Sequence, residues 1–399
     1  MSREIKTISY WSAASLALGI AIATGFGRFA YALILPEMRL DLGWNYALAG
    51  LPNTWNAIGN FAGALIALVA LRKTEPRWVF ITGLLLTCSA LLLTGISPRI
   101  EIIGLMRFVA GLGGSAAFAS GGALVAKLFE PYPKRSGTAI AIYFGGGGFG
   151  IALSSITVPL LDSYLGASGW PYSWFLLGVL ALASSSAPIL VALRVRIKNQ
   201  SGAPESFSLT SSWPTIASYS LYGGGYIVYL TFAFAWMREN HVSVLGSSFV
   251  WVLLGVASML SPRIWRYPMT HWYPSNVLAF SALVTSAAGV LPLTSPSYAV
   301  VALSAVLFGG SFYMAPASVT AFTRKHFAPT TWAPIITILT VLFSSFQAVS
   351  PLIAGIVADM YGLEVGFILG SALLLLSALI ALKQKQLDDY APIYRSTTK

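Results

Sequence analysis

The chain consists of long runs of apolar residues that are separated by short polar segments. A transmembrane helix needs about 20 mostly apolar residues, and twelve windows of the 399-residue sequence meet this requirement. They are Tyr10–Pro36, Tyr46–Leu71, Trp78–Ile96, Ile102–Phe129, Gly137–Tyr164, Tyr172–Leu193, Trp213–Met237, Val244–Leu260, Ser275–Leu293, Tyr298–Phe322, Ala333–Met360 and Val365–Leu382. No region alternates apolar and polar residues over many successive segments, which disfavours a transmembrane β-barrel. The pattern predicts an all-α membrane protein with twelve transmembrane helices.

The composition indicates that a lipid bilayer is the natural solvent of this protein. Hydrophobic residues make up 56% of the chain and charged residues 9%, whereas roughly a quarter of the residues are charged in soluble proteins. A soluble Rossmann or barrel enzyme and a disordered chain are therefore excluded. The sequence contains one cysteine, Cys88, so an intrachain disulfide is excluded as well.

The positive charges are unevenly distributed between the two sides of the membrane. The chain has 24 Lys and Arg residues and a net charge of +11. If the N-terminus is cytoplasmic, 19 of them fall in inside segments and three, Arg39, Arg99 and Arg238, fall outside. The positive-inside rule then predicts a multi-pass protein of the cytoplasmic (inner) membrane with both termini in the cytoplasm. The basic character reflects topology and anionic lipid, and we expect no nucleic-acid partner.

The second half of the chain repeats short patterns of the first half at offsets of 196 to 198 residues. The recurring pairs are Gly25 with Gly223, Gly27 with Gly225, Tyr31 with Tyr229, Gly113 with Gly309, Ser115 with Ser311, Phe129 with Phe327, Pro131 with Pro329, Asp162 with Asp359 and Tyr164 with Tyr361. Such order at nearly one offset indicates a duplication. We predict an N-terminal six-helix bundle over residues 1–198, a cytoplasmic linker over 199–212 and a C-terminal six-helix bundle over 213–399.

Two parallel repeats of six helices are typical of the major facilitator superfamily, and several motifs carry the same resemblance. Arg107 with Gly111 and the small residues that follow resembles the fourth-helix motif of this superfamily, and the glycines of 145–150 resemble its fifth-helix motif. The loop after the second helix keeps a basic end at Arg72 but lacks the usual Asp. The stretch 25–44 resembles the YbfB/YjiJ-type bacterial branch. The resemblance implies a transporter whose helices 1, 4, 7 and 10 line a central cavity.

Arg28 and Arg107 are the two charged residues that lie in the core of the predicted spans, away from the span ends. A charge inside a membrane helix is costly and usually functional, and the resemblance places both arginines in cavity-lining helices. Together they are candidates to bind a carboxylate, phosphate or sulfonate group of a substrate. The alternatives are structural: Arg28 reaches toward the outer surface, or Arg107 pairs with helix carbonyls or with Glu101.

Other candidate substrate contacts are polar or aromatic residues of the cavity-lining and neighbouring helices. They are Tyr31, Asn56, Tyr226, Tyr229, Tyr313 and Gln347. Asn56 is equally suited to a hydrogen bond with a neighbouring helix. The tyrosines are equally suited to packing, and Gln347 needs a polar partner in either role.

The polar chemistry of an enzyme is missing from the predicted spans. The 13 acids and three histidines fall at span ends or in loops, and no metal-ligand cluster or nucleophile–base pair stands out, so we expect neither an enzyme nor a metal or other cofactor. Glycines spaced four apart, such as Gly59 and Gly63 or Gly146 and Gly150, instead predict close helix contacts.

These observations predict a secondary transporter that moves a small amphipathic organic anion by alternating access. A broad-specificity efflux transporter is the alternative, and a non-transporting sensor on a transporter fold is a third. The expected partners are the substrate, the lipid bilayer and a coupling ion, either a proton or a counter-anion. We expect the protein to function as a monomer.

The charge distribution makes the topology testable. Single cysteines at Ser201, Ser295 and Ser396 in a Cys88→Ala background should differ in their access to a membrane-impermeant thiol reagent. Because the positive-inside rule puts both termini in the cytoplasm, only the cysteine at 295 should be labelled from outside intact cells. Labelling at 396 from outside would contradict the predicted orientation.

Overall fold

The structure is a computed structural model that describes residues 9–196 and 207–390, and the elements of these ranges are helices. In the first half they are α1 (Tyr10–Ile20), the π-helical η1 (Ala21–Phe29), α2 (Tyr31–Leu42), α3 (Tyr46–Lys73), α4 (Pro76–Thr94), α5 (Ile100–Leu128), α6 (Pro133–Leu165), η2 (Ala167–Gly169) and α7 (Trp170–Arg194). In the second half they are η3 (Thr210–Ser212), α8 (Trp213–Glu239), α9 (Val244–Ile264), α10 (Arg266–His271), α11 (Pro274–Val290), η4 (Leu291–Thr294), α12 (Tyr298–Phe312), α13 (Met314–His326), η5 (Pro329–Thr331), α14 (Trp332–Tyr361) and α15 (Leu363–Ala381).

Twelve of these helical segments are long enough to cross a membrane. Eleven of them in the described ranges are also apolar enough by composition, the first being the continuous segment Tyr10–Leu42. The twelfth is α8, whose 27 residues include many glycines and tyrosines. Since the side chains of α8 from Tyr222 to Met237 are buried inside the protein, this helix has little contact with lipid and does not need a continuously apolar surface. The all-α fold is confirmed.

The first membrane helix is longer than the sequence pattern predicts. The pattern places its end at Pro36, but α2 continues through this proline to Leu42. A proline removes one backbone donor and need not end a helix whose neighbours support it. The helix ends instead at Gly43, which has a φ of 65° and provides the left-handed cap. Glu37, which the pattern assigns to a loop, is therefore on a helix, and Asp162 lies in α6 with 8% of its surface exposed.

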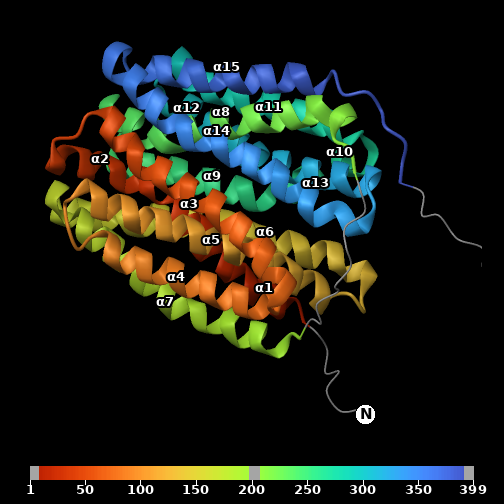
Figure 1. The fold of residues 1–399 in the computed structure, drawn as a ribbon. Coiled ribbons are helices and arrows are strands. Elements are labelled where there is room, and N and C mark those ends of the chain that lie inside the picture. Colours follow the sequence, from red (N-terminus) through yellow and green to blue (C-terminus); the bar gives the residue numbers. More distant parts are fainter. Residues whose placement is uncertain (1–8, 197–206, 391–399) are drawn as a thin grey trace, which may run out of the picture.

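The helices form two groups that follow the order of the sequence. Figure 1 shows the helices of the first half, drawn in red to yellow-green, on one side and those of the second half, drawn in green to blue, on the other. The groups meet along two seams, where α3 packs against α14 and α6 packs against α9. The boundary proposed at 198 and much of the proposed linker lie outside the described residues, between the end of α7 and η3.

Glycines allow these helices to approach each other closely. An added Cβ at Gly148 in α6 would collide with the carbonyl oxygen of Gly255 in α9, so this seam between the halves has space only for glycine. Within the first half, Gly150 is in the same situation against the backbone of Ala21 in η1. The predicted packing role of the glycines at the end of the 145–150 motif is confirmed.

Polar contacts join the two halves at the end of the bundle that carries Leu42 and Glu239, which we call the far end. Asp359 of α14 accepts hydrogen bonds from the first two backbone N–H groups of α3, at Tyr46 (2.7 Å) and Ala47 (2.9 Å). Glu239 of α8 accepts hydrogen bonds from the Tyr46 hydroxyl and from Arg39, whose Nη2 lies 3.1 Å away. The carboxylate of Asp359 thus completes the capping of a helix that belongs to the other half.

Removal of the Asp359 carboxylate should loosen the far end. Loss of an N-terminal capping group costs about 0.5–2 kcal/mol. Asp359→Ala should therefore reduce the ratio of molecules whose halves are in contact at the far end to molecules whose halves are apart there by roughly 2- to 30-fold. Spin labels at Arg99 and Ser297, one in each half, would report this as a longer distance distribution in pulsed electron paramagnetic resonance.

The matched control is Asp388→Ala, which removes an exposed acid at the opposite end of the protein. It should leave the label distances unchanged. Equal distributions in Asp359→Ala and the parent protein would show that this carboxylate does not hold the halves together.

Candidate functional site

The centre of the first membrane helix is a π-helix rather than an α-helix. Its backbone bonding pattern widens over Ala21–Phe29, and the N–H of Ala30 donates to the carbonyl of Gly25, five residues earlier, at 2.9 Å. Insertions of this kind are rare and occur frequently at functional sites, since they leave carbonyl groups without their α-helical partners. Gly25 permits this backbone to touch α6, because an added Cβ there would meet the backbone of Gly150.

Arg107 of α5 donates to two backbone carbonyl groups of the π-helix, although its Nε is buried without a partner. Its side chain has no solvent exposure, and it donates hydrogen bonds to the carbonyl oxygens of Gly27 (Nη1, 2.8 Å) and Arg28 (Nη2, 3.3 Å). The guanidinium also lies over the rings of Tyr31 and Trp174, at 5.3 Å and 5.1 Å from their centroids. The structure therefore gives Arg107 the structural partners that the sequence left as an alternative, helix carbonyls.

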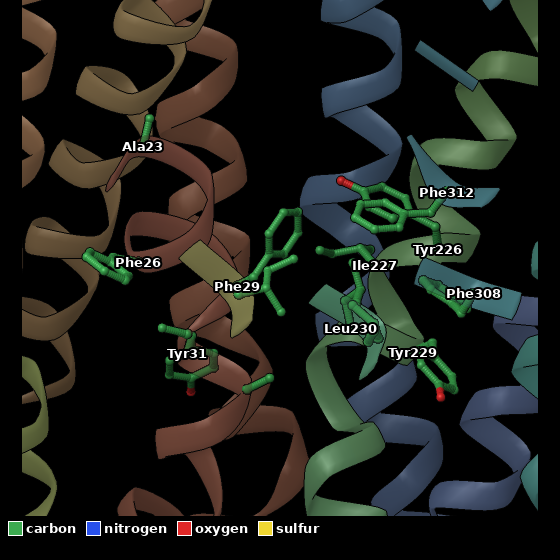
Figure 2. Close-up of a cluster of buried hydrophobic side chains, with 14 of the residues drawn as sticks. Ala23, Phe26, Phe29, Tyr31, Tyr226, Ile227, Tyr229, Leu230, Phe308 and Phe312 are labelled. Carbon is green, nitrogen blue, oxygen red and sulfur yellow. The ribbon is translucent and has the colours of Figure 1, made fainter. Parts of the chain in front are cut away.

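Asn56 and Tyr31 belong to the same buried cluster of the first half. The Asn56 amide donates to the carbonyl oxygens of Gly27 (3.2 Å) and Arg107 (3.0 Å). The Tyr31 hydroxyl donates to the carbonyl of Ala49 at 2.6 Å. Asn56 connects α3 to the π-helix and to α5, and Tyr31 connects α2 to α3. Figure 2 shows Tyr31 directed away from the second half.

Arg28 lies near aromatic side chains of both halves, with its guanidinium 5.6 Å from the ring centroid of Phe29. Its side chain is partly exposed, although its neighbours Gly27 and Phe29 are buried. One guanidinium nitrogen, Nη2, is buried without a hydrogen-bond partner. The charge of Arg28 interacts electrostatically with the hydroxyl groups of Tyr219, Tyr226 and Tyr313. The two arginines that the sequence treated as a pair therefore occupy different environments.

The second half presents aromatic and amide groups to Arg28. Tyr226 of α8 accepts a hydrogen bond from Nε2 of Gln347 in α14, while Oε1 of this fully buried glutamine has no partner. The Tyr226 ring stacks on Phe312 with 6.1 Å between centroids, and Phe312 meets Phe29 of the first half edge-on at 5.9 Å. Figure 2 shows this contact between the halves, with Phe29 facing Tyr226 and Phe312.

Tyr313 completes the arrangement from the end of α12. Its hydroxyl is buried without a hydrogen-bond partner, and it lies at Gly147 of α6, next to the Thr24 hydroxyl of the π-helix. We name the group formed by Arg28, Tyr226, Tyr313 and Gln347 the central cluster. Three of its four members have a buried polar atom without a partner, which is unusual for protein interiors.

Tyr229 lies outside the central cluster. Its hydroxyl is hydrogen-bonded to Ser304 at 2.8 Å and its ring stacks on Phe308 at 4.2 Å between centroids. These partners belong to the second half, so the structure gives Tyr229 a packing environment. The central cluster thus contains four of the eight predicted site residues. Of the other four, Arg107, Tyr31 and Asn56 have their partners in the first half, and Tyr229 has its partners in the second half.

Two residues near the central cluster were not predicted as site residues from the sequence. Tyr219 stacks on Phe343 at 4.6 Å between centroids, and its spacing of three and seven residues from Tyr222 and Tyr226 places all three on one face of α8. That spacing was available in the sequence. Phe343 lies in the apolar run of α14, and no sequence pattern distinguishes it from a lipid-facing residue.

Metal binding has no support in the described part of the chain, where no three His, Cys, Asp or Glu side chains gather into a potential ligand set. A cavity of about 220 Å³ lies at the far end, between Glu37, Asp162 and Arg238. The Asp162 carboxylate accepts a 2.6 Å hydrogen bond from Ser173 there. This cavity is separate from the central cluster.

Comparison with known proteins identifies the family. A family model described as "Uncharacterised MFS-type transporter YbfB" matches residues 20–382. The chain belongs to this family of major facilitator superfamily transporters. It is therefore a membrane transporter and not an enzyme, as the sequence motifs predicted. A search of curated protein sequences finds no match.

Solved structures share the fold at low sequence identity. A structure of a point mutant of the nucleoside transporter NupG matches with a TM-score of 0.70 at 14% identity, covering 94% of this chain and 100% of that one. A bacterial homologue of the human lysosomal transporter Spinster, in an inward-facing and unoccupied conformation, matches with a TM-score of 0.68 at 13% identity, covering 97% and 100%. At these identities the similarity establishes the fold alone.

The different environments of the two arginines predict different mutant phenotypes. Arg107→Met leaves the Arg28 carbonyl without a side-chain donor, and an unsatisfied buried group costs about 1–3 kcal/mol. It should lower the thermal stability of the purified protein in detergent. Arg28→Met removes a buried nitrogen that has no partner, so it should leave thermal stability unchanged or raise it. A larger loss in Arg28→Met than in Arg107→Met would contradict these assignments.

Proposed function

We propose that this protein is a secondary active transporter that moves a small amphipathic organic anion by alternating access. The observation that supports this most directly is the side chain of Arg28, a positive charge between the two halves with a buried nitrogen that lacks a partner. A buried polar atom without a hydrogen-bond partner is unfavourable. An anionic substrate that binds there supplies the missing acceptor.

The surroundings of Arg28 fit the apolar body of such a substrate. The aromatic rings of Phe29, Phe312 and Tyr226 lie next to it, and aromatic rings bury large apolar areas. No carboxylate of the described residues forms an ion pair with Arg28 at 4 Å or less. The site therefore combines one positive charge with an apolar wall, as an amphipathic anion requires.

The position of the site between the halves supports alternating access. Arg28 belongs to the first half, whereas Tyr226, Tyr313 and Gln347 belong to the second, so a substrate at the central cluster contacts both. Rocking of the halves changes these contacts, and only such a difference in contact lets a substrate shift the equilibrium between two states. The far-end contacts of Asp359 and Glu239 favour the state with that end joined.

Further properties remain part of the proposal. We place the protein in the cytoplasmic membrane with both termini inside, because of the distribution of its Lys and Arg residues. We propose that it acts as a monomer, since each chain holds both halves of the site. A proton or a counter-anion serves as the coupling ion. Arg107, Asn56 and Tyr31 contribute by stabilising the first half, and Tyr229 contributes by stabilising the second half, around the site.

Matched ligands test the charge preference of the site. Aryl carboxylates, sulfonates and phosphonates, with aryl alcohols and aryl amines of the same shape, should be measured by calorimetry on the purified chain. A hydrogen bond to a charged group contributes about 1.5–3 kcal/mol, so Arg28→Gln should weaken anion binding by roughly 10- to 100-fold. The neutral alcohols should bind the parent protein and Arg28→Gln equally.

The control variant is Arg99→Gln, which removes an exposed charge directly before α5 and should not change anion affinity. Stronger binding of the cationic amines would contradict the anion proposal and favour broad-specificity efflux. Unchanged anion affinity in a folded Arg28→Gln protein would also contradict it. Uptake of the best ligand into proteoliposomes, with and without a pH gradient, distinguishes a proton from a counter-anion.

A further inference from the structure

We propose that the transported anion carries a hydroxyl group that binds to the free end of the Gln347 amide, so that the substrate class is a small hydroxylated aromatic acid. This inference rests on the proposed function and adds a second polar contact to it. The anionic group would bind to Arg28 of the first half. The hydroxyl would bind to Gln347 of the second half.

The side-chain amide of Gln347 is only partly hydrogen-bonded. The side chain has no solvent exposure and lies in α14, where its neighbours are mostly apolar. Its Nε2 donates to the Tyr226 hydroxyl, but its Oε1 has no hydrogen-bond partner. A buried amide group that is left half satisfied costs about 1–3 kcal/mol. Leucine or methionine would fill this position without that cost, so a structural role alone does not explain a glutamine here.

The position of the free amide end relative to Arg28 also supports the inference. The Tyr226 hydroxyl interacts with both residues, through the hydrogen bond from Gln347 and through the charge of Arg28. The guanidinium of Arg28 lies 5.6 Å from the ring centroid of Phe29, which meets Phe312 edge-on at 5.9 Å, and Phe312 stacks on Tyr226 at 6.1 Å. Arg28 and Gln347 therefore adjoin the same group of aromatic rings. A single small ligand with two polar ends can reach both, and it replaces no existing hydrogen bond when it does so.

The chemistry of a primary amide defines the second polar group. If the amide is rotated by 180°, Tyr226 donates to Oε1 and the free group becomes the Nε2 donor. A hydroxyl group on the ligand can donate to a free Oε1 or accept from a free Nε2. It satisfies the amide in both orientations, whereas an ether, a fluorine or a methyl group does not.

The body of the ligand is set by the rings around these two groups. Phe343 and Tyr313 are partly exposed next to the buried ring of Tyr226, with 5.5 Å between the centroids of Tyr226 and Phe343. Aromatic rings stack or meet edge-on at centroid distances of this order. A planar ring that joins this group connects the two polar ends with little conformational entropy, which favours an aromatic over a flexible chain.

Binding of simple aromatic acids to the full-length chain tests the inference. The three hydroxybenzoate isomers are compared with benzoate and with the three fluorobenzoates by calorimetry. At least one hydroxybenzoate should bind the parent protein on the order of 10-fold more tightly than benzoate and than the fluorobenzoate of the same substitution, because it satisfies a buried polar group.

Variants assign the preference to Gln347. In Gln347→Met, which keeps the length of the side chain, the preference for the hydroxyl should disappear, so that the hydroxybenzoates and benzoate bind with equal affinity. Ser345→Ala is the matched control on the same helix, since this exposed hydroxyl bonds to its own helix at Val341, and it should keep the preference. Arg28→Gln should weaken all of the acids together.

The outcomes separate this inference from the proposed function. Equal affinity of the parent protein for benzoate and all hydroxybenzoates overturns the hydroxyl contact but leaves the anion transporter in place, and this comparison needs no variant. A preference that survives in Gln347→Met overturns the role of Gln347. Binding of aryl amines in preference to every acid overturns both proposals.

Discussion

The contact of Arg107 with the backbone of the first membrane helix is the interaction on which the rest of the site depends. The carbonyl groups of a π-helix inside an apolar bundle have no water with which to form hydrogen bonds. The fully buried guanidinium of Arg107 supplies donors to two of these carbonyls, and Asn56 shares one of them. Because a buried arginine is costly without partners, the π-helix and Arg107 stabilise each other.

The neighbouring Arg28 makes different contacts from Arg107. The backbone carbonyl of Arg28 accepts a hydrogen bond from Arg107 of the same half, while its guanidinium lies over Phe29 and its charge interacts with tyrosines of the second half. Two arginines from the same half thus have complementary roles. Arg107 holds the backbone through two hydrogen bonds, although its Nε has no partner, and Arg28 has an unpartnered Nη2 near the tyrosines of the second half.

Close helix packing and a few polar contacts determine how these halves can move. The seam between α6 and α9 is a backbone contact across Gly148 and Gly255, with no side chain between them. At the far end the contact is electrostatic, through Asp359 and Glu239. The duplicated acid Asp162 bonds within its own half, to Ser173. Asp162 and Asp359 occupy equivalent positions of the two repeats, but only Asp359 forms hydrogen bonds with the other half.

The sequence by itself determined the membrane environment, the all-α fold, the helix positions and the transporter family. These properties depend on runs of about 20 residues and on motifs that are local in the chain. The extension of the first helix beyond Pro36 was not predictable in this way, because whether a proline ends a helix depends on the surrounding packing.

Only the tertiary structure decided which candidates share a site. Arg28 and Arg107 look alike in the sequence, since both are arginines within apolar spans. They differ because the π-helix of Ala21–Phe29 offers free carbonyls to one of them. Gln347 and Tyr226 are 121 positions apart in the chain, and Arg28 is in the other half. Hydrogen bonding and desolvation of a buried group are set by neighbours in space, and the spacing of residues along the chain does not specify these neighbours.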